Sequence, residues 1–265
     1  MRFHQLRNAT CVIESGDQVL LIDPMLGKKG SLPLFARFRH KPQRNPLVPL
    51  PEIADELLPR VTACLLTHSQ KLGIKPLQHT DHLDAAGEQF LRENRIPVLT
   101  GKRDVAALTS MGLTVHAGLE YWQPTAALGG TITAVPATHG HGWVHSLMAN
   151  GVGFFLQLPS EPSIYFSGDT VYTEVVERVL AELKPDVAVM TSGGASLDVG
   201  GPILMPMEEL MTFVRNAPGK VVANHLEALN HCPITRQQLS AELARNSLTE
   251  KVLIPQDGES LNLQA

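Results

Sequence analysis

Short apolar runs separated by turn residues, rather than long helical repeats, fill the first quarter of the chain. Ala9–Glu14 and Val19–Ile22 are apolar runs with β-branched residues, and Ser15–Gln18 between them has the composition of a hairpin turn. Val61–Leu66 is a third apolar run, and a short helical pattern at Ile53–Leu58 precedes it. This part of the chain therefore predicts a β-hairpin, a short helix and a buried strand.

The middle of the chain alternates between helical and strand-like spacing of its apolar residues. The predicted helices and strands are, in order, the helix Leu83–Glu93, the strand Val98–Thr100, the helix Lys102–Met111 and the strand Leu113–Val115. This alternation predicts a layered α/β architecture. Strand-like runs then follow one another without helices, at Thr131–Val135, Gly153–Leu158 and Ser163–Ser167. Successive strands of this kind indicate antiparallel pairing.

The last third returns to alternating helices and strands. A helical pattern at Tyr172–Leu183 stops before Pro185, which disfavours helix at the residue before it. A capping box of Thr235 and Gln238 marks the start of the final helix. The other predicted elements are the strand Asp186–Met190, the helix Glu208–Asn216, the strand Val221–Ala223 and a closing strand at Val252–Ile254. With no internal repeat or linker, residues 1–265 are expected to form one domain.

Two long stretches lack any clear period. Met25–Pro51 contains several prolines and a series of lysines and arginines, and Thr191–Met205 contains two Gly-Gly pairs. Long loops in a compact domain are often functional, so the basic stretch is interpreted as a flap that attracts an anionic substrate to the site. The alternative is a solvated surface loop.

Composition narrows the class of protein. Hydrophobic residues make up 43% and charged residues 18% of the chain, and the net charge of −4 offers no bulk attraction for nucleic acid. Three scattered cysteines without C-x-x-C spacing indicate a reducing compartment, so a cytoplasmic protein is expected. The N-terminus shows no apolar segment of signal length, and no apolar run reaches 18 residues, so no membrane span is expected. Assembly into a homo-oligomer stays open.

The turn His79-Thr80-Asp81-His82 has the strongest concentration of potential metal ligands in the chain. It places three metal-binding side chains within four residues, downstream of the apolar run that ends at His68. A lone histidine is more often a surface or hydrogen-bonded core residue than a ligand, but three ligand types in one turn indicate a metal site. Further candidates each follow a strand-like run, namely His139, Asp169 and His225.

With these landmarks in order, the chain resembles the metallo-β-lactamase superfamily, whose hallmark is a strand ending in His-x-His-x-Asp-His and running into a helix. The last four residues of the hallmark stand at His79–His82, whereas ten residues, Ser69–Gln78, occupy the place of the single residue after His68. The resemblance spans nearly the whole chain. It implies an α/β fold, a four-layer αββα sandwich of two mixed β-sheets with the metal turns along one edge.

The resemblance also implies a ligand set. His68, His79 and His139 correspond to one metal site, Asp81, His82 and His225 to the other, and Asp169 to a carboxylate that bridges both. The implied cofactor is two divalent ions, expected to be zinc, with manganese or iron as alternatives. In the superfamily an Asp at the position of Asp23 sits behind the metal site, although a turn-forming Asp before Pro24 is an equal interpretation.

Paired ions of this kind lower the pKa of water, so the implied function is hydrolysis of a small ester, lactone or phosphoester by a metal-bound hydroxide. Asp81 is the candidate for orienting the attacking water. His231 follows His225 in a pattern that resembles the branch containing the L-ascorbate-6-phosphate lactonases, and it is a candidate proton donor or substrate contact, or else an exposed histidine.

Several alternatives remain at this point. The chain could be a phosphodiesterase or nuclease of the same fold, or a degenerate metal-binding protein without activity. His68 is expected to ligate despite the insertion, because loop closure entropy grows slowly with length. Otherwise His68 is a hydrogen-bonded residue at a strand end, which would leave one site weak and the enzyme running on a single ion. A further alternative is that the loop supplies the missing group, from Gln70 or Gln78.

Overall fold

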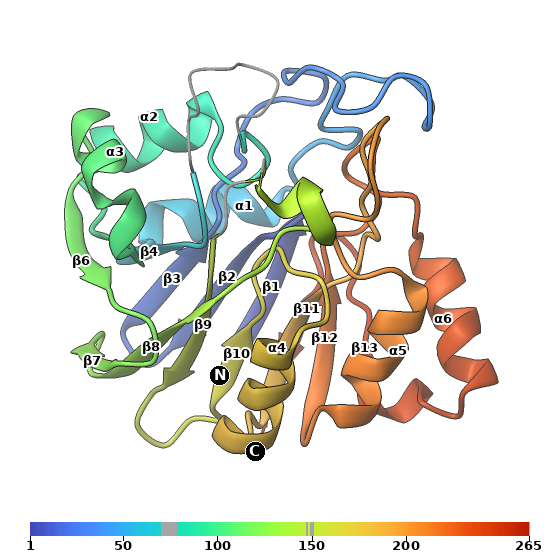
Figure 1. The fold of residues 1–265 in the computed structure, drawn as a ribbon. Helices are drawn as coiled ribbons and strands as arrows, with labels where there is room; N and C mark the ends of the chain where they lie inside the picture. The colour runs from blue at the N-terminus through green and yellow to red at the C-terminus, as the bar shows by residue number, and fades with distance from the viewer. Residues whose placement is uncertain (70–78, 147, 149–150, 265) are drawn as a thin grey trace.

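The computed structural model describes residues 1–69, 79–146, 148 and 151–264, which form two β-sheets with helices outside them (Figure 1). Within these ranges each sheet has seven strands, in the orders β14-β1-β2-β3-β4-β5-β6 and β13-β12-β11-β10-β9-β8-β7. Each sheet is antiparallel in one half and parallel in the other, so both are mixed. The predicted pair of mixed sheets is confirmed.

The first sheet begins with the predicted hairpin. Its strands are β1 (Arg2–Arg7), β2 (Thr10–Ser15), β3 (Gln18–Ile22), β4 (Ala63–Leu66), β5 (Val98–Gly101), β6 (Val115–Leu119) and β14 (Ser260–Asn262). From β14 to β3 the neighbours are antiparallel, and from β3 to β6 they are parallel. The parallel half needs crossovers, which the helices between these strands supply.

The second sheet repeats this division. Its strands are β7 (Pro124–Ala127), β8 (Gly130–Pro136), β9 (Val152–Gln157), β10 (Ile164–Phe166), β11 (Val187–Thr191), β12 (Lys220–Asn224) and β13 (Val252–Leu253). From β7 to β10 the strands are antiparallel, as the three successive strand-like runs predicted, and from β10 to β13 they are parallel.

Apolar side chains pack between the two sheets and between each sheet and its outer helices, in three clusters. Phe3, Leu65, Phe154 and Val189 belong to the cluster between the two sheets. One further cluster joins the first sheet to α1 (Ile53–Leu57), α2 (Ala85–Glu93) and α3 (Val105–Ser110). Another joins the second sheet to α4 (Glu174–Arg178), α5 (Met207–Asn216) and α6 (Arg236–Arg245). Helices therefore cover both outer faces, as the αββα expectation required (Figure 1).

The sequence prediction missed the strands β1, β7 and β14, and it placed the last strand of the chain too early. Val252–Ile254 is not the closing strand, because β14 follows it and pairs with β1. β1 was not predicted because His4, Gln5 and Arg7 are polar and yet buried. The sequence of β1 therefore lacks the alternation of apolar and polar residues that identifies a strand. The helix expected from Tyr172 begins at Glu174, and its last turn, Val179–Leu183, is a π-helix.

All strands that precede a candidate ligand end at the same edge of the sandwich. The long loops 25–51 and 191–205 and the short 3-10 turn Gly142–Ser146 gather at this edge (Figure 1). Among the described helices, none combines the length and the hydrophobicity that crossing a bilayer requires.

Candidate metal centre

Strand ends from both sheets deliver the candidate ligands to one place. His68 follows β4 by two residues and His139 follows β8 by three. Asp169 follows β10, and His225 comes directly after β12 with a positive φ of 59°. The remaining three, His79, Asp81 and His82, lie in the turn that leads to α2, where Asp84 caps the helix through Gly87 N. Neither Asp81 nor Asp169 is a helix cap.

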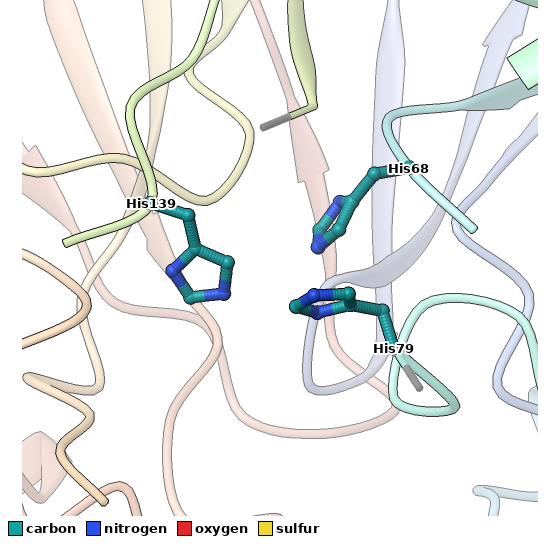
Figure 2. Close-up of side chains that lie close together, drawn as sticks. All are labelled: His68, His79 and His139. Atoms are coloured by element: carbon teal, nitrogen blue, oxygen red, sulfur yellow. The ribbon is translucent and has the colours of Figure 1, made fainter. Parts of the chain in front are cut away.

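The first group of side chains contains His68, His79 and His139. One ring nitrogen from each lies within 4.8 Å of the others, and all three residues are buried. Figure 2 shows the three imidazole rings facing a common space. The ring centroids of His68 and His79 are 4.5 Å apart, and those of His79 and His139 are 5.2 Å apart. The geometry thus brings together the set predicted for one ion.

The second group contains Asp81, His82, Asp169 and His225, whose ligand atoms again lie within 4.8 Å of one another. Asp169 joins the two groups. Its Oδ2 is 3.1 Å from His82 Nε2 and 3.5 Å from His139 Nε2, and its Oδ1 is 3.7 Å from His225 Nε2. Asp81 Oδ2 lies 3.7 Å from His82 Nε2. Asp169 therefore occupies the position expected of a bridging carboxylate.

The electrostatics divide the histidines into two kinds. Burial, followed by the neighbouring histidines, lowers the pKa of His68 well below its usual value and lowers the pKa of His79 to about 3. Burial also disfavours the charged form of His82, but Asp169, Asp23 and Asp81 outweigh it and hold the pKa of His82 well above its usual value. The neighbouring carboxylates therefore favour the charged, doubly protonated form of His82.

Outer hydrogen bonds fix which ring nitrogen of His68, His82 and His139 faces the centre. His82 Nδ1 donates to Asp23 Oδ2 at 2.9 Å, and His139 Nδ1 donates to the Ile203 carbonyl at 2.7 Å. The Thr67 hydroxyl donates to Asp23 Oδ2 at 2.8 Å and can accept from His68 Nδ1 at 2.9 Å. Each bond leaves Nε2 directed inward, as metal-binding histidines require. Asp23 thus lies behind the site, as the resemblance implied.

The buried polar atoms fit a metal better than any protein partner. His68 Nε2, His79 Nε2, His225 Nε2 and Asp169 Oδ1 are buried and have no hydrogen-bond partner. Buried polar atoms are almost always paired, so four orphans aimed at one place mark a missing ligand. Imidazole nitrogen with carboxylate oxygen is the donor set that zinc and similar divalent ions prefer. The residues present therefore fit the implied ions.

His231 is buried rather than exposed, so the surface alternative for it is wrong. The Phe35 ring meets it edge to face, with centroids 5.1 Å apart. Burial lowers the pKa of His231 to about 4, with the charges of Asp81 and His225 acting on it in opposite directions. His231 is therefore a neutral imidazole at neutral pH.

Hydrogen bonds hold the long loop 25–51 against the rim of the site. The side chain of Asn230 accepts from Phe35 N at 2.9 Å and donates to the Ala36 carbonyl at 2.6 Å. The carboxylate of Asp198 accepts from the backbone of Arg37–Arg39 at 2.8 to 3.0 Å. These contacts support the interpretation of the loop as a flap beside the site.

Some residues of the site carried no signal in the sequence. Thr67 and the Ile203 carbonyl act only through tertiary contacts, and so does Asn8, whose side chain donates to the Asp81 carbonyl and whose own carbonyl accepts from His225 N. Cys232 Sγ lies 3.6 Å from His225 Nδ1. Of the segment Ser69–Gln78 the structure describes Ser69, and the alternative ligands Gln70 and Gln78 lie outside the described residues.

A cavity of about 570 Å³ lies between the ends of β5, β6 and β8, and its lining includes Thr138, the residue before His139. Leu119, Pro136 and Ala137 form an apolar part of its wall, and Tyr121 and Thr138 contribute polar groups. Charged side chains of both signs also line it, namely Lys102, Arg103 and Glu120, and Lys102 forms an ion pair with Glu120. This volume is typical of small-molecule sites, which combine apolar walls with a few polar groups.

Comparison with known proteins agrees with the fold and the site. The family model described as Beta-lactamase superfamily domain matches residues 18–225. The UPF0173 protein YddR of Bacillus subtilis (strain 168) is 30% identical over 263 residues, which cover 98% of this chain and 99% of that protein. Among solved structures, the isothiocyanate hydrolase from Delia radicum gut bacteria is 31% identical over 100% of both chains, with a TM-score of 0.87.

A second solved structure, described as "a possible metal-dependent hydrolase" from Veillonella parvula DSM 2008, is 27% identical with a TM-score of 0.88 and covers 99% of both chains. The match to the family model covers most of the chain, and the relatives align over nearly all of it. The chain therefore belongs to the metallo-β-lactamase superfamily, as one of its metal-dependent hydrolases.

Proposed function

We propose that the seven clustered side chains hold two divalent metal ions and that the protein hydrolyses a small molecule at this centre. His68, His79 and His139 would hold one ion, and Asp81, His82 and His225 the other, with Asp169 shared between them. The observation that carries the proposal is the set of buried, unpartnered ligand atoms directed at one place. Zinc is the first candidate because the donors are nitrogen and oxygen, and manganese or iron would accept the same donors.

Bound divalent ions supply a hydrolytic nucleophile at neutral pH and polarise the bond that is broken. The protein's own groups would then position the reactants. Asp81 is the carboxylate proposed to orient the attacking water. Its Oδ2 lies 3.9 Å from His225 Nε2, within the ligand cluster. His231, a neutral imidazole at neutral pH, is proposed to donate a hydrogen bond to the substrate or leaving group.

The cavity between the ends of β5, β6 and β8 supports a substrate of modest size. Its apolar wall suits a hydrocarbon or aryl group, and its charged and polar side chains suit a polar substituent. Esters, lactones and phosphoesters are the substrates proposed first, including those of the L-ascorbate-6-phosphate lactonase branch. The three cysteines are free and buried, which supports a cytoplasmic location for this activity.

A second candidate function is the hydrolysis of isothiocyanates. It rests on the isothiocyanate hydrolase that is 31% identical over the entire chain. An isothiocyanate also carries an electrophilic carbon open to attack by water, so the same centre could act on it. Its small organic substituent would fit the apolar wall of the cavity.

The test is a metal analysis followed by a substrate panel. Purified protein should carry up to two equivalents of zinc, manganese or iron, and the metal-loaded protein should hydrolyse members of one class among lactones, carboxylic esters, phosphodiesters and isothiocyanates. Asp81→Asn should reduce turnover by at least about a hundredfold while the protein stays folded. Absence of metal after reconstitution would overturn the proposal, and the identity of the hydrolysed class decides between the two candidates.

A further inference from the structure

Asp104 lies outside the ligand set but is tied to the chain directly after His68. It belongs to the 3-10 turn Lys102–Asp104, which follows β5, the strand paired in parallel with β4. Its Oδ2 accepts a hydrogen bond from Ser69 N at 2.8 Å and another from Ser69 Oγ at 3.2 Å. Both residues are buried. A buried carboxylate with two donors from a single residue fixes that residue closely.

The backbone of His68 needs such support because the next ligand, His79, is far from it in the sequence. In the superfamily hallmark one residue separates the first two histidines, whereas ten separate His68 from His79 here. The His79 turn therefore cannot restrain the His68 backbone through a short connection. On the other side, a Cβ on Gly151 would lie 2.9 Å from His68 Cβ, so only glycine allows this close packing. His68 is thus held between Gly151 and the clamped Ser69.

We propose that Asp104 is a positioning residue that fixes His68 for metal binding by clamping Ser69. This inference rests on the proposed metal centre. His68 Nε2 is buried without a partner, so the direction of this nitrogen depends on the bond that Nδ1 makes to Thr67 and on the backbone that carries the ring. The Thr67 hydroxyl fixes the tautomer through Nδ1, and the Asp104 clamp fixes the backbone that carries the ring.

The chain offers a matched control for this clamp. Asp186 Oδ2 accepts from Ser163 N at 2.8 Å and from Ser163 Oγ at 2.7 Å, the same two hydrogen bonds as between Asp104 and Ser69, but at an exposed position where Asp186 N also donates to Ser163 Oγ at 3.0 Å. Asp186 and Ser163 precede β11 and β10, at the sheet edge opposite the ligands. Losing this second clamp removes the same hydrogen bonds without touching the candidate centre.

The experiment titrates cobalt into metal-free protein and follows the visible absorption of each bound equivalent. Asp104→Ala should weaken one of the two equivalents by about tenfold or more and change its spectrum, while the other equivalent keeps its affinity. Asp104→Asn, which can still accept from Ser69 N, should recover most of this affinity, and Ser69→Ala should lose only a part of it. Asp186→Ala should bind both equivalents as the wild type does.

Each outcome decides the inference. Wild-type affinity and spectrum for both equivalents in Asp104→Ala would overturn it, and so would an equal loss in Asp186→Ala, because that result would report general destabilisation. If Asp104→Ala does not fold, a loss confined to one equivalent in Ser69→Ala supports the clamp, and unchanged binding in that variant overturns it. Wild-type protein that binds no cobalt would overturn the proposed metal centre itself, which is a different result from a failed clamp.

Discussion

At the scale of single residues, Asp169 is the side chain that lies near histidines of both halves of the candidate centre. Its two carboxylate oxygens lie 3.1 Å from His82, 3.5 Å from His139 and 3.7 Å from His225. We expect Asp169→Ala to lower the metal content more than any other single ligand change, because it removes a donor from both ions and leaves their repulsion unscreened. Elemental analysis of the purified variants measures this.

The control for Asp169 is Asp198→Ala, which removes a carboxylate that accepts hydrogen bonds from backbone N–H groups of the flap. That variant should retain the metal content of the wild type. If Asp169→Ala kept full stoichiometry, or lost no more metal than His225→Ala, the bridging role would be wrong.

His82 leads to a prediction about protons. Asp169, Asp23 and Asp81 hold the pKa of His82 well above its usual value of about 6.5. The charged imidazolium, with both ring nitrogens protonated, is therefore the form expected in metal-free protein at pH 7. A metal ligand must be neutral, so we expect metal binding at pH 7 to release about one proton from His82, and metal affinity to fall as the pH is lowered. Calorimetric titration in buffers of different ionisation enthalpy measures the release.

Asp23→Asn provides the comparison for His82, because it removes one of the three charges that raise the pKa. The number of protons released at pH 7 should decrease in this variant. Equal release in the variant and the wild type would contradict the assignment of the proton to His82.

The sequence predicted much of this site at the residue scale, and its limits have a physical reason. Ligand types such as His79, Asp81 and His82 are crowded in one turn, and each distant ligand follows a strand, so their spacing is visible in the chain. Thr67 and Asn8 orient the ligands through contacts that form only when strands meet. A common polar residue at a strand end carries no local pattern that distinguishes it.

At the scale of elements, the buried guanidinium of Arg7 anchors the flap. Arg7 Nη2 donates to the carbonyls of Met25 at 2.5 Å and Gly27 at 3.0 Å, and Nη1 donates to the Val48 carbonyl at 3.1 Å. These carbonyls lie at both ends of the loop 25–51. Since an unsatisfied buried polar group costs about 1–3 kcal/mol, we expect Arg7→Met to lower the free energy of unfolding by about 3 kcal/mol. The loop should also become a site of proteolysis.

Arg44→Met is the matched control, because Arg44 also donates to two carbonyls of this loop, at Gly30 and Ser31, but does so at the surface. Its effect should stay within about 0.5 kcal/mol. Denaturant unfolding and limited proteolysis compare the two variants. An Arg7→Met protein as stable and as resistant as Arg44→Met would contradict the anchoring role.

The strands differ in how well their sequence patterns predicted them. Strands with apolar runs, such as β2, β3 and β9, were predicted nearly to their ends, because burial on both faces makes them continuous. β1 was missed because its buried positions are held by hydrogen bonds to distant loops rather than by apolar contacts alone. β14 is a three-residue strand whose pairing with β1 depends on the completed fold.

At the scale of the whole molecule, the core between the sheets leads us to expect one cooperative unit. Phe3 and Leu65 from the first sheet pack in the same cluster as Phe154 and Val189 from the second. β14, near the end of the chain, completes the sheet that β1 begins. Neither sheet can unfold without exposing the apolar face of the other, so calorimetry and circular dichroism should report a single coincident transition.

Removing the metal tests whether the two sheets unfold together. Ions that bind only the folded chain stabilise it by about 2.7 kcal/mol when their free concentration is a hundred times Kd, which corresponds to about 5–10 °C in Tm for a chain of this size. Because the proposed ligands come from both sheets, chelation should move the entire transition to lower temperature without splitting it. Two resolved transitions in the metal-free protein, with only one of them restored by added metal, would show instead that the two sheets belong to separate domains.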